Sequence, residues 1–410
     1  MKVAILGFGT VGSSVARILV DLRPEGVHLS HIFNRGVARK IVDWVPSTVV
    51  WTEDFDGILR SDVDVVVELA GGLEPAGTWV RRALEAGKSV VTGNKKLIAA
   101  HGIELDRLAR SKAAHLLYGA AVAGGIPVIP GLQQGLAGDR ITRIEGILNG
   151  TCNYILSRME AGAAFADVLA DAQKLGYAEA NPSEDVDGYD ARAKLVILAR
   201  IALRASLEVD SVACRSITQV DAVDLVYARD LGCTIRQISK AELLPDGVSA
   251  AVGPMLVPLR SPLAWSRSTE NMVLVSGQYG GDVVFSGHGA GGNPTAVAVV
   301  SDLISLAHGS RSAELPSRPT QVSGEFLLRH YIRFVVKDSP GIVAEIAGAV
   351  AAEKINIDAL FQRPGYEKAH LPFVVTVEPC AASALRRAID RIAHASWLAY
   401  PPLDMPILGE

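Results

Sequence analysis

The chain has 410 residues, which is enough for two or three domains with large buried cores. Its 49% hydrophobic and 20% charged residues are typical of a globular protein, and its net charge of −4 argues against nucleic-acid binding and attachment to an anionic membrane. The four cysteines show neither a C-x-x-C pair nor metal-ligand spacing, which predicts reduced thiols in a cytoplasmic protein. We expect no signal peptide before the first strand, and no membrane span in the glycine-broken uncharged run of residues 113–138.

The chain opens with a short apolar run, Val3–Leu6, and a glycine-rich turn follows directly. The turn reads G-F-G-T-V-G, and apolar residues then recur at helical spacing as far as Leu22. In this strand–turn–helix setting the first glycine makes the turn, the second admits a pyrophosphate, and the third lets the helix pack on the strand. Free N–H groups at the helix N-terminus favour the phosphates. We therefore predict a dinucleotide site formed by Gly7, Phe8, Gly9, Thr10, Val11 and Gly12.

Further apolar runs alternate with helical patterns through the first third of the chain. The predicted strands are Val27–Phe33, Val49–Trp51, Val63–Leu69, Ser89–Thr92 and His115–Tyr118, and the predicted helices include Thr78–Ala86 and Ile103–Ser111. This alternation indicates an α/β unit with a Rossmann-type, doubly wound parallel sheet.

The ends of these strands carry the candidate cofactor contacts, because ligands collect at the carboxyl ends of parallel strands. The second strand ends in Asn34-Arg35 and lacks the acid that would bind a ribose 2′-hydroxyl, so NADP is predicted over NAD. The alternative is a solvated basic turn. Lys95 falls where nicotinamide and substrate should meet, whereas Lys96 is expected to be solvated. The other candidate cofactor contacts at strand ends are Ala70, Gly71, Thr92 and Asn94.

Beyond about residue 131 the pattern changes, and a strand at Arg143–Leu148 leads into the turn Gly150-Thr151 before a helix. Such a turn offers N–H groups and a hydroxyl to a carboxylate. Farther along, acids gather around a proline turn before an apolar helical pattern that carries Asp190 and Lys194. Their spacing of four places them on one face, where the carboxylate can tune the lysine's proton affinity. By itself the pattern also fits an exposed surface ion pair.

Four segments resemble signatures of the homoserine dehydrogenase family, in the family's order. They read V-V-T-G-N-K-K, G-I-L-N-G-T-C-N-Y-I-L, L-G-Y-A-E-A-N-P-S-E-D-V-D-G-Y-D-A-R-A-K-L and G-A-G-G-N-P-T-A. The resemblance covers nearly the whole chain and is to the monofunctional form. It implies NAD(P)-linked interconversion of L-homoserine and L-aspartate 4-semialdehyde in threonine, methionine and isoleucine biosynthesis.

The resemblance also implies residue roles. Lys194 resembles the proton donor to the carbonyl, and Lys95 the second lysine beside substrate and nicotinamide. Asp190 would orient substrate and Lys194, and Glu179 would hold the substrate ammonium. Two lysines suit the acid and the positive charge that a developing alkoxide needs. The remaining implied contacts are Asp185, Tyr177, Gly150 and Thr151 for substrate, and Gly176 and Gly292 for cofactor.

The family's Y-E-A-x-V-A-G-G loop has Gly119 here in place of the glutamate. In relatives this loop binds a monovalent cation largely through backbone carbonyls, so Na⁺ or K⁺ is a candidate ligand. His288 stands where arginine is usual, and Gly93 where alanine is usual. The implied cation ligands are the carbonyl groups of Gly119, Val122, Gly124 and Ile126.

The last part of the chain predicts a βαββαβ unit. Ser339 and Pro340 are expected to start its first helix as N-cap and first helical residue. The D-S-P-G and I-N-I motifs resemble an ACT domain, a module that binds amino acids at subunit contacts. The resemblance implies feedback inhibition by L-threonine through Asp338 and Asn356. The alternative is a dimerisation module that senses nothing.

The predicted organisation is thus a Rossmann-type domain, an α+β catalytic and dimerisation domain, and an ACT domain in a homodimer or dimer of dimers. The bounds are 1–130 for the nucleotide domain, 131–293 for the catalytic domain, 294–315 for a helix returning to the nucleotide domain, 316–327 for a linker and 328–410 for the ACT domain.

Two other functions are open to this sequence. A catalytically silent regulator on the same scaffold should have lost a key residue, yet all four of Lys95, Glu179, Asp190 and Lys194 are present. A dehydrogenase for another amino-acid semialdehyde is the second, because the pocket acids indicate a free amino group without fixing the chain length.

Overall fold

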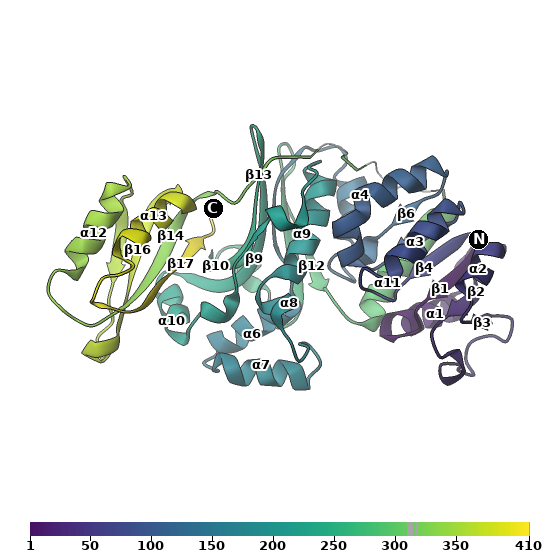
Figure 1. Ribbon diagram of the computed structural model, residues 1–410, viewed down its shortest axis with the longest axis horizontal. Coiled ribbons are helices and arrows are strands. Elements are labelled where there is room, and N and C mark those ends of the chain that lie inside the picture. Colours follow the sequence, from purple (N-terminus) through teal and green to yellow (C-terminus); the bar gives the residue numbers. More distant parts are fainter. Residues whose placement is uncertain (310–314, 317–318, 410) are drawn as a thin grey trace.

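Two sheets organise the molecule (Figure 1). The computed structural model describes residues 1–309, 315–316 and 319–409. The first sheet is parallel, with six strands in the order β3-β2-β1-β4-β5-β6. The second is a mixed sheet of eleven strands whose main path runs β12-β11-β7-β9-β10-β17-β14-β16-β15. The parallel sheet lies at one end of the elongated molecule and the C-terminal unit at the other (Figure 1).

The predicted nucleotide unit is confirmed as a Rossmann-type α/β sheet. Its elements are β1 (Lys2–Leu6), α1 (Thr10–Leu22), β2 (His28–Phe33), β3 (Val50–Thr52), α2 (Phe55–Arg60), β4 (Val65–Glu68), α3 (Ala76–Glu85), β5 (Ser89–Thr92), α4 (Lys95–Ser111) and β6 (Leu116–Leu117). The helix expected from Ile103 begins eight residues earlier, at Lys95. It starts there because Asn94 caps it, with its side-chain oxygen accepting the N–H of Leu97 at 3.1 Å.

The middle of the chain wraps helices around the mixed sheet. Its elements are α5 (Val128–Pro130), β7 (Ile141–Ile147), α6 (Gly150–Glu160), α7 (Phe165–Lys174), α8 (Ser183–Val186), α9 (Tyr189–Ala202), β8 (Ala213–Cys214), α10 (Ala222–Asp230), β9 (Cys233–Leu244), β10 (Gly247–Pro258), β11 (Glu270–Gly277), β12 (Gly281–His288) and α11 (Gly292–Ala307). The last of these helices, α11, packs on α1, and its Val299 and Leu303 join the core of the nucleotide unit.

The C-terminal unit has the predicted βαββαβ order. Its elements are β14 (Leu327–Val336), α12 (Ile342–Ala352), β15 (Ile357–Phe361), β16 (Leu371–Ala381), α13 (Ala382–Ile392) and β17 (Leu398–Ile407). The predicted helix start at Ser339 and Pro340 is wrong. Gly341 has φ of +99°, a left-handed conformation that interrupts the turn, so α12 begins only at Ile342.

One sheet crosses the expected boundary between the middle and C-terminal units. β10 and β17 pair in parallel at Leu256 and Ile407, and the N–H of Leu408 donates to the Leu256 carbonyl at 2.8 Å. Part of the predicted linker, β13 (Val322–Ser323), also pairs with β10. Residues 317 and 318 of that linker lie outside the described residues. Among the described helices, none is long and apolar enough to cross a membrane.

Candidate active site

The glycine-rich turn has the geometry that its sequence predicts. A Cβ at Gly12 would lie 1.9 Å from the Gly7 carbonyl oxygen, so only glycine lets α1 approach β1 so closely. At Gly9, by contrast, a Cβ would meet nothing within 4 Å. The turn therefore leaves open space at the N-terminus of α1, where backbone N–H groups suit a phosphate.

The end of β2 is tied to this turn by Asn34. Its side-chain oxygen accepts the N–H of Phe8 at 3.1 Å, and its side-chain nitrogen donates to the carbonyl of Arg35 at 2.7 Å. Arg35 is exposed, and Arg39 and Lys40 are exposed just beyond it. The turn thus presents basic side chains beside the nucleotide loop.

Glu68 organises the next two loops, although no role beyond ending a strand was predicted for it. Its carboxylate is fully buried and accepts the N–H groups of Ala70 at 2.8 Å and Gly71 at 2.9 Å, and the hydroxyl of Thr92 at 2.6 Å. Asn94 donates to the carbonyl of Gly72 at 2.6 Å while capping α4. These contacts hold four predicted cofactor residues together and place Lys95 at the first position of a helix.

The centre of the site is the carboxylate of Asp190 on α9. One of its oxygens lies 2.6 Å from Nζ of Lys95, and the other lies 2.8 Å from Nζ of Lys194. Lys194 also donates to the carbonyl of Leu148 at 2.7 Å. Asp190 is only 5% exposed and Lys194 only 9%, so the pair that the sequence left open as a surface contact is buried.

Burial and pairing shift these three groups in different directions. Burial alone would raise the pKa of Asp190, but the charges of Lys194 and Lys95 outweigh it and hold that pKa well below its usual range. Burial would lower the pKa of Lys95, yet the Asp190 carboxylate raises it overall. Burial lowers the pKa of Lys194, and the charge of Lys95 lowers it further. Together they outweigh the Asp190 carboxylate, which raises it. One lysine is thus held charged while the other is brought closer to releasing its proton.

A second acid, Asp185, lies beside the first. Burial raises its pKa, a hydrogen bond from Asn149 opposes this, and the charge of Asp190 raises it further. Asn149 donates to both acids, at 2.7 Å to Asp185 and 2.9 Å to Asp190. No role was predicted for Asn149 from the sequence. The signal for it was an N-cap residue directly before the predicted Gly150-Thr151 turn.

These groups line one cavity of about 430 Å³, which brings together most of the predicted catalytic and substrate residues. Glu179 is exposed and lies outside the lining, so its role stays a prediction. The lining residues that the sequence predicted are Lys95, Gly150, Thr151, Gly176, Tyr177, Asp185, Asp190 and Lys194. The other lining residues are Asn149, Leu175, Thr269, Asn271, His288, Gly289, Ala290 and Gly291.

Asn271 is a lining residue that no sequence pattern marked. It is 1% exposed, and its side-chain nitrogen is buried without a hydrogen-bond partner in the described part of the chain. A Cβ at Gly289 would lie 2.1 Å from the Asn271 amide carbon, so any larger residue there would displace the Asn271 side chain. An orphaned buried donor on a cavity wall suits a ligand oxygen.

Lys96 differs from the expectation that it is merely solvated. Its Nζ lies 3.0 Å from Oε1 of Glu184, and both side chains are about half exposed, at 46% and 56%. The contact joins α4 to α8 across the two units. Its exposure makes it a weak tie compared with the buried pairs of Asp190.

A carboxyl group from another element contacts the predicted cation loop. Asp302 on α11 accepts the N–H of Gly119 at 2.8 Å, and a Cβ at Gly119 would lie 2.9 Å from the other oxygen. The absence of a side chain at Gly119 therefore accommodates Asp302. Burial raises the pKa of Asp302 to about 7, although the hydrogen bond from Gly119 opposes this shift.

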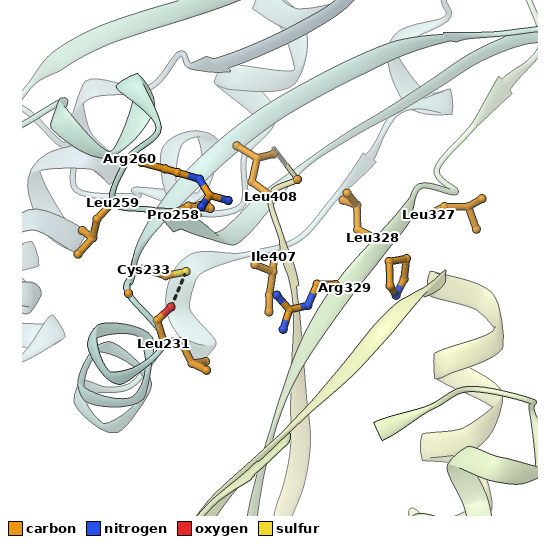
Figure 2. A pocket seen from close by; sticks show the side chains of 13 residues that line it. Leu231, Cys233, Pro258, Leu259, Arg260, Leu327, Leu328, Arg329, Ile407 and Leu408 are labelled. Carbon is orange, nitrogen blue, oxygen red and sulfur yellow. Dashed lines mark hydrogen bonds between the residues drawn. The ribbon is translucent and has the colours of Figure 1, made fainter. Parts of the chain in front are cut away.

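The two predicted effector residues are exposed and pair with their neighbours. Asp338 lies 3.6 Å from Nζ of Lys368, and Asn356 donates to Oε2 of Glu378 at 3.0 Å. A separate cavity of about 560 Å³ lies where the C-terminal unit meets β9 and β10 (Figure 2). Its lining is mostly apolar, with Arg260 and Arg329, and includes none of the predicted site residues.

Comparison with known proteins identifies the family. Models of the homoserine dehydrogenase NAD-binding domain, of homoserine dehydrogenase and of the ACT domain match residues 7–119, 127–304 and 330–393. The homoserine dehydrogenase of Mycobacterium tuberculosis is 40% identical over 95% of this chain and 93% of its own length. The chain belongs to the homoserine dehydrogenase family. The homoserine dehydrogenase of Corynebacterium glutamicum is 38% identical over 95% of this chain and 91% of its own length.

Solved structures of the family agree. A homoserine dehydrogenase from Thiobacillus denitrificans matches with a TM-score of 0.92 and 33% identity, covering 100% of this chain and 98% of its own. The Staphylococcus aureus homoserine dehydrogenase at pH 6.5 matches with a TM-score of 0.80 and 29% identity, covering 100% and 99%. The chain is therefore an oxidoreductase of this family, with an NAD(P)-binding domain and a C-terminal ACT domain.

Proposed function

We propose that the chain interconverts L-homoserine and L-aspartate 4-semialdehyde with NADP, and that its cavity beside Asp190 is where this happens. The observation that carries the proposal is the pairing of two lysines with the two oxygens of one buried carboxylate. Reduction of an aldehyde builds negative charge on oxygen, which needs a proton and a fixed positive charge. The site supplies both next to the nucleotide unit.

The two lysines divide the work according to their surroundings. When bound, the reduced nicotinamide supplies a hydride to the aldehyde carbon. Lys194 gives its Nζ proton to the oxygen, because burial and Lys95 lower its pKa. Lys95 stays charged, because Asp190 raises its pKa, and it stabilises the developing alkoxide. Asp190 holds both ammonium groups in place.

The substrate is an amino acid, so its two charged groups need partners. The N-terminus of α6, with Gly150 and Thr151, faces the cavity and suits the carboxylate. Thr151 is held by its hydroxyl, which donates to the carbonyl of Tyr177 at 2.7 Å. Asp185 lines the cavity and suits the ammonium. Glu179, two residues beyond Tyr177, would add negative charge near the mouth.

The cofactor residues fit a dinucleotide that carries a 2′-phosphate. Gly7 to Gly12 provide the phosphate turn, and the exposed Arg35 stands where NAD enzymes place an acid. An archaeal homoserine dehydrogenase described in complex with NADPH matches this chain with a TM-score of 0.63, 27% identity and coverage of 74% of this chain and 96% of its own. The other proposed contacts are Ala70, Gly71, Thr92, Asn94, Gly176 and Gly292.

The remaining parts of the proposal rest on fewer contacts. The carbonyls of Gly119, Val122, Gly124 and Ile126 would hold Na⁺ or K⁺ beside Asp302, and a bound cation would favour the ionised form of that carboxyl. L-Threonine would bind through Asp338 and Asn356 at a contact between two copies of the chain. We propose that the enzyme is a cytoplasmic homodimer or dimer of dimers serving threonine, methionine and isoleucine biosynthesis, with the domain bounds that the sequence predicts.

The test is oxidation of L-homoserine by the purified protein, followed by the absorbance of the reduced nicotinamide, with NADP and NAD run side by side. We expect turnover with a higher kcat/KM for NADP. The variant Arg35→Glu should reverse that preference by about tenfold, since a charge-assisted hydrogen bond is worth about 1.5–3 kcal/mol. Equal use of both cofactors by the wild type would refute the NADP assignment and leave the reaction itself standing.

A further inference from the structure

Asn149 lies directly before α6, between the two acids of the cavity. It is only 4% exposed. Its side-chain oxygen accepts the backbone N–H of Cys152 at 2.8 Å, while its nitrogen donates to Asp185 at 2.7 Å and to Asp190 at 2.9 Å. A single amide therefore caps a helix and bridges two carboxylates from α8 and α9.

The orientation of this amide is fixed by what surrounds it. An asparagine side chain has one acceptor oxygen and two N–H donors. Turning the amide over would direct its oxygen at two carboxylates and its NH₂ group at the N–H of Cys152. Neither arrangement makes a hydrogen bond, so the donors must face Asp185 and Asp190.

The bridging amide lies between two carboxylates that repel each other when both are charged. Asp190 is neutralised by two lysines, but no lysine or arginine in the described residues forms an ion pair with Asp185. Burial and the Asp190 charge both favour the neutral form of Asp185, and they are opposed first by the Asn149 hydrogen bond and then by the charges of Lys194 and Lys95. Asn149 also shares the Asp190 oxygen with Lys194, at 2.9 Å and 2.8 Å. That oxygen is thereby fixed from two directions.

We propose that Asn149 is a positioning residue, which keeps Asp185 ionised and fixes the Asp190 oxygen that holds Lys194. The inference rests on the proposed function, in which Asp185 receives the substrate ammonium and Lys194 exchanges the proton. Through Cys152 the same amide also sets the start of α6, which presents Thr151 to the cavity. One neutral side chain thus aligns Asp185, the proposed partner of the substrate ammonium, with Lys194, the proposed proton donor.

The variant Asn149→Asp separates bridging from capping. It retains the shape and the oxygen that accepts from Cys152, but replaces the shared donor with a third carboxylate. We expect the acid limb of kcat/KM for L-homoserine to move up by about one pH unit or more, because the added negative charge favours both the protonated form of Asp185 and the charged form of Lys194, whose neutral form oxidation needs. At neutral pH, KM should rise by a larger factor than kcat falls.

The matched control is Asp221→Ala, which removes the N-cap of α10 outside the cavity lining. It should lower the melting temperature without moving the acid limb. Asn149→Ala removes cap and bridge together and should show both effects. An acid limb in Asn149→Asp that coincides with that of the wild type would overturn the proposal.

A second measurement does not depend on turnover. The melting temperatures of Asn149→Asp and wild type are compared between about pH 4 and 8. A buried carboxyl beside two acids has a folded pKa above its unfolded value, so its cost grows as pH rises through this range. A difference in melting temperature that widens as pH rises supports the bridge, even if the wild type fails to oxidise L-homoserine. Such a failure would refute only the proposed function. A difference that stays constant with pH contradicts the bridge.

Discussion

The substrate cavity and the predicted effector region treat their charged groups in opposite ways. In the cavity, Asp190 is 5% exposed and binds two lysines from different helices. In the ACT domain, Asp338 is exposed, and its neighbour Lys368 lies 3.6 Å away in solvent. The first region is already enclosed within one chain. In the proposed dimer, the second would be enclosed only against another copy of the chain.

The difference shows where geometry in a single chain can define a site. Buried charges must be paired or hydrogen-bonded, so their positions are determined by their partners. Exposed pairs are worth about 0–1 kcal/mol and place little constraint on their side chains. The catalytic residues can therefore be argued from distances, whereas the effector residues depend on the family resemblance.

The largest effect is expected from removing Lys194, the proposed proton donor. Lys194→Ala should lower kcat for L-homoserine oxidation by about 10²–10⁴-fold, the usual contribution of a general acid or base. Binding of NADPH, measured by fluorescence titration, should persist. The matched control is Lys96→Ala, which removes only an exposed pair with Glu184. Comparable losses in both variants would remove the distinction between buried and exposed lysines.

The next prediction compares the two regions directly through stability. Asp190→Asn leaves two ammonium groups without their shared carboxylate in the cavity, and should cost about 3–5 kcal/mol of unfolding free energy. Asp338→Asn breaks the exposed pair with Lys368, and should cost less than about 1 kcal/mol. Urea unfolding measures both. Equal costs would show that burial does not distinguish the two aspartates.

A third aspartate tests burial without a lysine partner. Burial raises the pKa of Asp302 from 3.8 to about 7. Because the folded value exceeds the unfolded one, its destabilising effect is absent below about pH 4 and grows until about pH 7. In a buffer without Na⁺ and K⁺, Asp302→Asn should therefore gain stability relative to wild type across this range, by up to about 4 kcal/mol. A stability difference that is flat between these pH values would contradict the assignment.

The smallest effect is expected in the ACT domain, on the inhibition of the enzyme by L-threonine. Asn356→Ala should raise the L-threonine concentration needed for half inhibition by about tenfold, if one hydrogen bond to a charged group is lost. Arg386→Ala, an exposed change on α13, is the control and should leave the inhibition as it is. Identical threonine responses in all three proteins would remove Asn356 from the effector site.

Much of the nucleotide unit followed from local patterns. The Gly7–Gly12 turn and the strands around it obey rules of spacing that act over a few residues. The strand-end rule and the family resemblance also predicted eight of the sixteen residues that line the cavity. The start of α4 was missed because its first turn is polar, with Lys95 and Lys96 following the Asn94 cap. The start of α12 was wrong because Gly341 adopts a positive φ.

Other features depend on contacts that no local pattern contains. Asn149 meets acids that lie 36 and 41 residues farther along the chain. Asn271 is an unremarkable strand residue until folding places it on the cavity wall. The pairing of Leu256 with Ile407 joins strands from distant parts of the sequence. The sequence therefore predicts which units form, and tertiary packing decides how they share a sheet and a site.

The most direct test of the central claim is the pH dependence of L-homoserine oxidation in wild type and Lys95→Met. Oxidation needs a neutral Lys194 to accept the hydroxyl proton, so activity should rise with pH through its lowered pKa. Lys95 contributes to lowering that pKa, so its removal should move the rise to higher pH in the activity that remains. A rise that stays at the same pH in Lys95→Met would contradict the division of roles between the two lysines.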